Sequence, residues 1–397
     1  MTGRADPYPP RRAPLDARAM RQENLGLVLA EVVRRPPMAQ ADLVEATGLK
    51  KATVSRLLEE LVRLGWVRPS GAQAGLVGRP RTLFAPDPDQ GTVVSTRISL
   101  DGVSVTAVNF GGARRRALQE PLDVAGRPQP EVAETLGRLV RELLDETGGP
   151  VLGAALALPG IVDGGRLGYA PGLDWPDRDA TALLRRALPG RLAPDAPLVT
   201  GNEARFAAVG EQRYGAAAGV DDFVYLLGEA GVGAGVVAGG RLFEGSRGAA
   251  GEVGHVSIAL EGRRCSCGKV GCWATFVGES ELVHLAGSTG DAEDVIAGAR
   301  AGDRAAQDAI TAMRRPLAAG IGNLVSAYDP ELVVLGGFLA AAFGGDLDAL
   351  RAEVDDWVMG GGVHTALRLE ASRVEDASLL GGVALVHDRV VQAPRRG

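Results

Sequence analysis

Four residues in the second half of the chain have the types and the spacing of a metal site. Cys265, Cys267 and Cys272 form a C-x-C-x4-C run, and His255 lies ten residues before it. Three thiolates and one imidazole are the ligand set of a closed, tetrahedral zinc site, which leaves no position open for a catalytic water. A redox pair would need only two cysteines and no histidine, and three cysteines within eight residues do not form a disulfide framework. The sequence therefore predicts a structural Zn²⁺ held by these four residues.

The first part of the chain differs in charge from the rest. Residues 1–88 carry a net charge of +5, whereas the remaining 309 residues carry −11. A basic segment attached to an acidic body indicates that the segment binds a polyanion and the body does not.

The hydrophobic spacing in the basic segment predicts three helices and a two-stranded wing. The helices are expected at 24–35, 40–46 and 51–65, and the strands begin at 66 and return at 79–84 around a turn at 75–78. The residues expected to be buried in the first and third helices are Leu25, Val28, Leu29, Val32, Val54, Leu57, Leu58 and Leu61. Gly48 suits the left-handed turn before the third helix. This order is that of a winged helix-turn-helix.

The third of these helices has the features of a recognition helix. Small and basic residues at its N-terminal end allow close approach to the major groove, and arginines on the wing can contact phosphates. The residues expected to contact DNA are Lys50, Lys51, Thr53, Ser55, Arg56, Arg79 and Arg81. The alternative is a three-helix domain used only for dimerisation. The turn glycine, the small residues, the basic wing and the charge asymmetry together favour DNA binding.

Length and composition bound the remaining possibilities. The chain has 397 residues, 46% hydrophobic and 23% charged, which excludes disordered, collagen-like and small disulfide-stapled proteins. The N-terminus lacks the apolar segment of a secretory signal, and no apolar run is long enough to span a membrane. We expect a cytoplasmic protein with a flexible arm at 1–22 and a winged helix-turn-helix at 23–88.

The body of the chain resembles the ROK family of bacterial repressors, open reading frames and sugar kinases. The motifs that carry the resemblance occur in order: GLVGRP after the winged helix, GAALALPGIVD, GNEARFAAVGE, GVGAGVVAGGRLFEGSRGAAGEVGH, the cysteine run and IGNLVSAYDPELVVLGG. They cover nearly the whole chain after about residue 20, and they are most similar to the transcriptional-repressor branch, the xylose- and N-acetylglucosamine-type repressors.

The resemblance implies an actin-like (ribonuclease-H-like) ATPase fold with a sugar site between two α/β lobes. We expect lobes at 89–203 and 204–397, the second with the zinc loop, and a last helix that returns to the first lobe. The residue pattern itself also predicts an α/β architecture. Strand-like runs (92–98, 103–110, 151–158, 223–227, 235–238 and 332–335) alternate with helical stretches (130–147, 203–214 and 305–328).

The motif that binds ATP phosphates in the family's kinases is altered. Those kinases have an Asp-x-Gly-Gly-Thr turn, and this chain has Arg97-Ile98-Ser99-Leu100-Asp101 at that place. Side chains replace both glycines, and the metal-positioning carboxylate is lost. The second phosphate loop keeps Gly231, Gly233 and Gly235 but has Val232 where kinases carry Thr. Such glycines also serve as tight strand connections, which is the interpretation we favour here.

The sugar-binding residues that the resemblance implies are partly retained. They are Asn202, Glu203, Glu252 and His255, with Glu203 at the family's general-base position and Ala274 where a kinase has a sugar-binding Glu. The first two would equally suit the N-terminus of a helix, as cap and as favourable charge. Zinc binding alone would explain His255.

These observations predict a sugar-responsive DNA-binding repressor without catalytic activity. Its partners would be double-stranded operator DNA and a monosaccharide effector, and operator half-sites imply a homodimer or higher homo-oligomer. The first alternative is a ROK sugar kinase that uses ATP. The second is a ligand-independent DNA-binding protein with a vestigial sugar site, which Ala274 favours.

Overall fold

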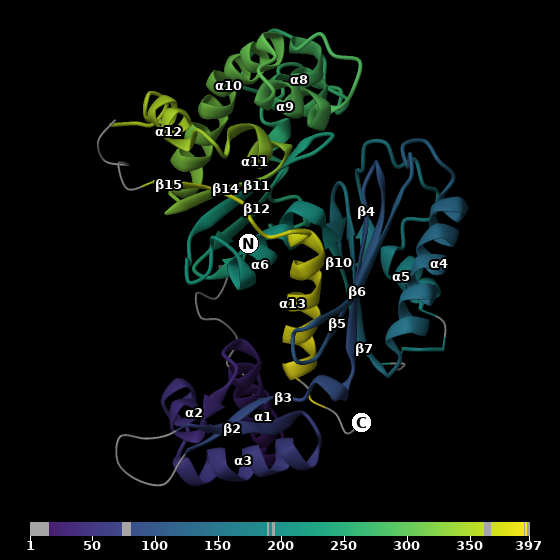
Figure 1. Cartoon of the computed structure of the whole chain (residues 1–397), viewed down its shortest axis with the longest axis vertical. Coiled ribbons are helices and arrows are strands. Elements are labelled where there is room, and N and C mark those ends of the chain that lie inside the picture. The colour runs from purple at the N-terminus through teal and green to yellow at the C-terminus, as the bar shows by residue number, and fades with distance from the viewer. Residues whose placement is uncertain are drawn as a thin grey trace, which may run out of the picture. The chain divides into compact units, whose positions relative to one another are not determined.

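The computed structural model describes residues 16–73, 81–188, 190–192, 195–360, 367–392 and 394 (Figure 1). The chain divides into two compact units. The first comprises the chain up to Gly91, the turn Asn109–Ala113 and the chain from His387, and the second comprises Thr92–Val108 and Arg114–Val386. Among the described residues, no helix is long and apolar enough to cross a membrane.

The first unit is the predicted winged helix. Its helices are α1 (Ala17–Arg34), α2 (Gln40–Thr47) and α3 (Lys51–Arg63), and its strands are β1 (Met38–Ala39), β2 (Val67–Gln73) and β3 (Arg81–Pro86) in the order β1-β3-β2. All eight apolar residues expected in its core are buried. Gly48 ends α2 with a φ of 66°, the left-handed conformation that the turn requires. The expected turn at 75–78 lies outside the described residues.

Helix α1 begins earlier than the sequence predicted. Asp16 caps it by accepting a hydrogen bond from the backbone N–H of Ala19 at 2.7 Å, so residues 17–22, expected in a flexible arm, are helical. Arg21 in this segment forms an ion pair with Glu60 of α3 at 2.8 Å. The weak apolar pattern of 17–22 concealed this turn of helix, which polar contacts hold in place.

Two distant chain segments complete the first unit. The ring of Phe110, from the turn Asn109–Ala113, lies edge-on to Trp66 at 5.0 Å and to His387 at 5.5 Å between centroids. Phe110 is 1% exposed. Helix α13 (Ala377–Gln392) approaches α1 closely at its end, because a Cβ on Gly26 would lie 2.8 Å from the carbonyl oxygen of Val391. The winged helix is therefore packed against residues distant in sequence.

The second unit contains two five-stranded sheets. The strands of the first, in the order β10-β7-β4-β5-β6, are β4 (Thr92–Ile98), β5 (Gly102–Asn109), β6 (Arg114–Pro121), β7 (Val151–Leu158) and β10 (Leu198–Asn202). Strands β4, β7 and β10 are parallel, whereas β5 and β6 form an antiparallel hairpin. The apolar faces of α4 (Gln129–Thr147) and α5 (Ala180–Ala187) join the core of this sheet. A short ribbon, β8 (Val162–Asp163) with β9 (Arg166–Leu167), follows β7.

The second sheet repeats this plan. Its strands, in the order β13-β12-β11-β14-β15, are β11 (Phe223–Gly228), β12 (Val232–Ala238), β13 (Arg241–Leu242), β14 (Leu332–Gly337) and β15 (Arg368–Ala371). Strands β11, β14 and β15 are parallel, and β12 is antiparallel to β11. The helices that follow or flank it are α7 (Ala274–Val277), α8 (Glu279–Leu285), α9 (Ala292–Arg300), α10 (Arg304–Tyr328), α11 (Phe338–Phe343) and α12 (Leu347–Asp355).

Two helices pack closely on these sheets where glycines allow it. Gly382 of α13 faces the first sheet, where a Cβ would lie 2.9 Å from the Cβ of Ala155 in β7. Gly235 of β12 faces α6 (Glu203–Tyr214), where a Cβ would lie 2.4 Å from the Cβ of Ala208. The α/β architecture expected from the alternation of strands and helices is confirmed.

Candidate functional site

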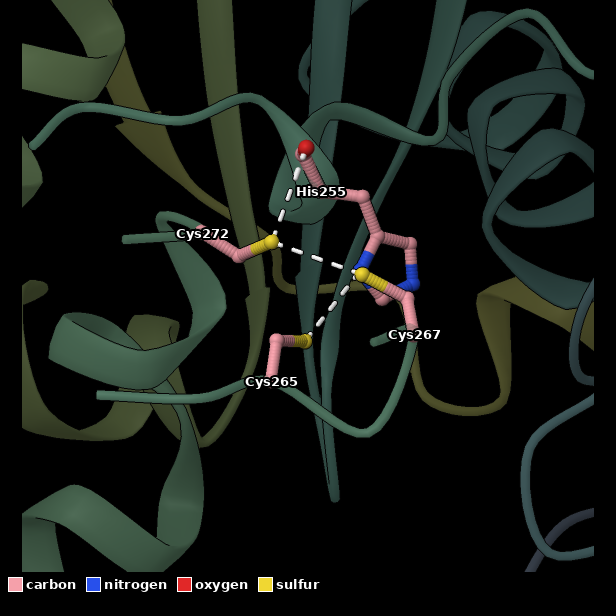
Figure 2. A group of neighbouring side chains, drawn as sticks. All are labelled: His255, Cys265, Cys267 and Cys272. Carbon is pink, nitrogen blue, oxygen red and sulfur yellow. Dashed lines mark hydrogen bonds between the residues drawn. The ribbon is translucent and has the colours of Figure 1, made fainter. Parts of the chain in front are cut away.

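The structure brings the four predicted metal ligands together. One ligand atom from each of His255, Cys265, Cys267 and Cys272 lies within 4.8 Å of the other three. The Sγ of Cys265 lies 3.6 Å from Nδ1 of His255, and the Sγ atoms of Cys267 and Cys272 are 3.5 Å apart. Figure 2 shows the four side chains directed toward one another.

These distances fit a tetrahedral metal ion. A Zn–S bond of about 2.3 Å places two ligand sulfurs of one tetrahedron roughly 3.8 Å apart. Burial and the neighbouring thiols raise the pKa of Cys272, whereas hydrogen bonds to Cys265 lower the pKa of that thiol against the effect of burial. The side-chain cluster can therefore hold a metal ion.

Glycines position the loop that carries Glu252 and His255. Gly251 has a φ of 95°, and a Cβ there would lie 2.0 Å from the carbonyl oxygen of Ala234 in β12. At Gly254 a Cβ would lie 2.2 Å from the carbonyl oxygen of Val232. The loop lies directly on β12 because neither position has a side chain.

Asn202 caps α6. Its Oδ1 accepts hydrogen bonds from the backbone N–H groups of Ala204 (2.9 Å) and Arg205 (3.2 Å), and its Nδ2 donates to the carbonyl oxygen of Gly160 at 2.9 Å. The helix-terminal role that the sequence analysis weighed for this residue is thus present. These bonds also fix the direction of the side chain.

Glu203 and Arg97 form an ion-pair cluster with Glu229. The Nε–H of Arg97 donates to Oε2 of Glu203 at 3.1 Å, and its Nη2 donates to Glu229. Burial and the charge of Glu203 raise the pKa of Glu229 to about 8, against the opposing effect of Arg97. Burial also raises the pKa of Glu203. The carboxylate of Glu203, which the sequence resemblance places at the general-base position, is therefore bound by an arginine.

The turn after β4 is closed by the side chain of Ser99. The Oγ of Ser99 donates to Asp101, and the N–H of Ser99 donates to the carbonyl oxygen of Gly102 at 3.0 Å. In the second Gly-rich loop, Gly235 packs directly against α6, where no side chain would fit. A Cβ on Gly233 would lie 3.4 Å from the Cβ of Ala204, an ordinary contact, so the packing of α6 on β12 explains Gly235 alone.

Sequence reasoning missed Glu229 and Arg205. Arg205 is 3% exposed, donates to the carbonyl oxygen of Val162 at 2.8 Å, and lies 3.8 Å from Glu244. Burial raises the pKa of Glu252, and the charge of Arg205 opposes this shift only in part. Two features of the sequence could have indicated them. Arg205 lies among the apolar residues of α6, and Glu229 directly follows the buried strand β11.

The predicted DNA-contacting residues lie at one end of α3 and on the wing. Lys50, Lys51, Arg56 and Arg81 are exposed, and Thr53 and Ser55 are half-buried. Within the described ranges, no side chain caps the N-terminus of α3. Arg79 lies outside the described residues.

Comparison with known proteins identifies both parts of the chain. The model of the ROK family matches residues 105–389, and the model of the MarR family matches residues 26–74. Over 404 residues the chain is 30% identical to a protein named putative xylose repressor from Caldicellulosiruptor sp. (strain Rt8B.4), with 94% of this chain and 98% of that protein covered.

Solved structures share the fold. A ROK family transcriptional regulator described as a homologue of the Escherichia coli MLC protein superposes with a TM-score of 0.79 at 22% identity, covering 94% of this chain and 98% of that chain. A ROK family glucokinase from Streptomyces griseus gives 0.66 at 24% identity, covering 74% and 99%. The ROK model spans well over half of this sequence, and the protein therefore belongs to the ROK family and carries a MarR-type winged helix in front of the ROK domain.

Proposed function

We propose that this protein is a sugar-responsive transcriptional repressor that does not catalyse phosphoryl transfer. The observation that carries the proposal is the union of a winged helix and a ROK domain in one chain. The residues Arg97-Ile98-Ser99-Leu100-Asp101, which we align with the kinase motif, support the absence of catalysis. Relatives named xylose repressor align over nearly their full length.

The winged helix would bind operator DNA through α3. Lys50, Lys51 and Arg56 present positive charge at the helix that enters the major groove. The uncapped N-terminus of α3 adds a partial positive charge that attracts phosphate. Ser55 and Thr53 would face base edges, and Arg81 with Arg79 would contact phosphates from the wing.

The effector would be a monosaccharide held by Asn202, Glu203, Glu252 and His255. The Nε–H of Arg97 already donates to Oε2 of Glu203 at 3.1 Å, so a sugar hydroxyl that binds Glu203 must compete with Arg97. A ligand changes a conformational equilibrium only when it binds one conformer more tightly than the other. A sugar whose hydroxyl replaces Arg97 at Glu203 would bind more tightly to the conformer in which Arg97 has moved away, and this supplies the difference in affinity.

The same ion pair argues against catalysis. A general base must reach the proton that it removes, but the carboxylate of Glu203 is already bound to Arg97. Burial lowers the pKa of Arg97, but the neighbouring carboxylates raise it above the ordinary value, so the guanidinium keeps its charge. The triphosphate of ATP would also meet Glu229 and Asp101 near Arg97, where the kinases have backbone N–H groups. This arrangement supports a sensor rather than a kinase.

The metal would be Zn²⁺ with a structural role. Four protein ligands complete its coordination, and the ion would hold the loop of Cys265–Cys272 against His255. Because His255 is also a candidate for sugar binding, the metal would fix the position of one wall of the effector site.

Selection of bound DNA by the full chain, with and without sugars, tests the whole proposal. We expect enrichment of a two-fold symmetric operator, as a homodimer requires, and its release by one sugar of a panel that includes D-xylose, D-glucose and N-acetylglucosamine. ATP-dependent phosphorylation of any sugar in the same panel, well above background, would contradict the absence of catalysis. Operator binding that no sugar changes would favour the ligand-independent alternative.

A further inference from the structure

Cys272, one of the predicted metal ligands, is held firmly by its surroundings. Its backbone pairs with Ser257 in an antiparallel bridge, and Cys272 itself is 0% exposed. The next residue, Trp273, is 1% exposed and donates from Nε1 to the carbonyl oxygen of Pro316 in α10 at 2.9 Å. The thiol of Cys272 therefore has a fixed position and is shielded from solvent.

Cys267, a second predicted ligand, lies on an open turn. It is half-buried, whereas the other two cysteines are buried. The N–H of Gly268 donates to the carbonyl oxygen of Cys265 at 2.9 Å, and the N–H of Cys265 donates to that of Lys269 at 2.8 Å, so the turn is closed by its own backbone. A Cβ on Gly268 would meet no atom of the described residues within 4 Å. Of the three cysteines, Cys267 is therefore the most open to solvent, and its turn has free space beside it.

The sulfurs of Cys267 and Cys272 can bond after a small movement. They lie 3.5 Å apart, and a disulfide requires about 2.05 Å between its sulfurs. Between the two residues, Gly268 and Gly271 have φ values of 88° and 71°. Glycine adopts and leaves such conformations without the steric cost that a side chain imposes. The movement falls on the turn of Cys267, because Cys272 is anchored.

We propose that Cys267 and Cys272 form an oxidation site, which a hydroperoxide converts from a pair of metal ligands into a disulfide. With hydrogen peroxide, the thiolate of Cys267 attacks one oxygen, the O–O bond breaks, and a sulfenic acid forms as hydroxide leaves. The thiolate of Cys272 then attacks the sulfenic sulfur, and a second hydroxide leaves as the S–S bond forms. Two thiolates thus lose two electrons, and these reduce the peroxide. His255 and Cys265 would remain as ligands, so the loop would release the ion.

The oxidation would also change the proposed effector site. Loss of the ion frees the imidazole of His255, and the turn that moves contains Ser266, whose carbonyl oxygen accepts a hydrogen bond from Tyr169. This consequence rests on the proposed sugar response, whereas the disulfide rests only on the proposed metal site. A measurement of bound zinc before oxidation tests the metal site by itself.

Treatment of the zinc-loaded full chain with hydrogen peroxide tests the proposal. We expect a chelating dye to detect release of the zinc in step with the loss of two thiols, and a reducing agent with added zinc to reverse both changes. Trypsin cuts after Arg264 and Lys269. The proposed disulfide therefore joins two tryptic peptides, and their fragmentation by mass spectrometry identifies the linked sulfurs. Retention of zinc by the oxidised protein, or a disulfide that includes Cys265, would overturn the proposal.

Two variants that each keep two cysteines provide the matched comparison. Cys265→Ser retains the proposed pair and should form its disulfide readily under peroxide. Cys267→Ser leaves two buried cysteines and should form a disulfide at least about tenfold more slowly, because reactive thiols need access to the oxidant. Equal rates in the two variants would contradict the role of Cys267. If either variant fails to fold, the disulfide map of the parent still decides. Release of operator DNA by a sugar is a separate readout, so the disulfide and the sugar response can fail independently.

Discussion

At the residue scale, a single arginine joins two acidic side chains of the ROK domain, since Arg97 binds both Glu203 and Glu229. We propose that Arg97 occupies the position of the aspartate in the family's kinases. On that proposal, a position that would attract a metal ion and phosphates in a kinase becomes an internal ion pair. ATP at this site would then place like charges together, and a sugar bound to Glu203 would require Arg97 to release it.

The raised pKa of Glu229 predicts how its replacement affects stability. Because burial and Glu203 raise that pKa to about 8, the native state binds this proton more tightly than the unfolded state does. The contribution of Glu229 to the free energy of unfolding therefore falls as the pH rises from about 4.5 to 8. Glu229→Gln cannot ionise, so its melting temperature minus that of the parent should increase over this interval. Thermal unfolding at closely spaced pH values measures the difference.

The matched control for this measurement is Glu293→Gln, which removes an exposed carboxylate. Its melting temperature should stay at a constant offset from that of the parent between pH 5 and 8. A flat difference for Glu229→Gln as well would mean that Arg97 outweighs burial, and that Glu229 stays ionised throughout.

At the scale of elements, strong apolar runs were predictable and exposed edges were not. Strands β4 and β7 and helix α6 have the predicted bounds, because the two strands are buried on both faces and Asn202 caps the start of the helix. Strand β6 was missed, since its sequence RRRALQEP is an exposed edge rich in arginine. The convergence of His255 with the three cysteines was predictable from their spacing alone. Glu229 was not, because its role depends on a salt bridge to Arg97, more than a hundred residues away in sequence.

The cysteine loop should depend on its metal. Cys267→Ser removes one of four ligands, so we expect the purified protein to lose its bound zinc and to melt at a lower temperature, as should the parent treated with a chelator. Metal analysis by mass spectrometry and thermal unfolding measure both effects. Tyr169→Phe is the control, because it removes only the hydrogen bond from Tyr169 to the carbonyl oxygen of Ser266 and should retain one zinc per chain. Equal stability of the metal-free and metal-loaded parent would exclude a structural role.

The turn Asn109–Ala113 should stabilise the winged helix through one ring. Phe110 is fully buried between Trp66 and His387, and truncation of such a residue costs about 3–5 kcal/mol of unfolding free energy. Phe110→Ala should therefore lower the denaturant midpoint of the first unit markedly. Phe243→Ala, at a site that is 48% exposed, should change stability by about 0.5 kcal/mol or less. Similar small effects at both positions would mean that the aromatic contacts do not hold the first unit together.

At the scale of the whole molecule, the chain path joins the two units at more than one place. The last residue of β5, Asn109, and the end of α13 from His387 onward belong to the winged-helix unit. A change of conformation in the ROK domain therefore has covalent routes to the DNA-binding unit besides the connection at Gly91. This supports regulation of DNA binding by a ligand of the ROK domain.

The separation of charge between the two parts of the chain predicts where salt acts on DNA binding. If the basic segment alone meets the phosphates, then Lys51→Ala should weaken operator binding and make the slope of log K against log salt less negative by about 0.9, the value for one lost phosphate contact. Because phosphate contacts carry no sequence information, non-operator DNA should lose affinity in parallel. Arg351→Ala removes the same charge from an exposed position of α12 and should leave the slope unchanged. Fluorescence anisotropy of the full-length proteins across a salt series measures both slopes, and equal slopes for the two variants would show that net charge, rather than contact by α3, determines the binding.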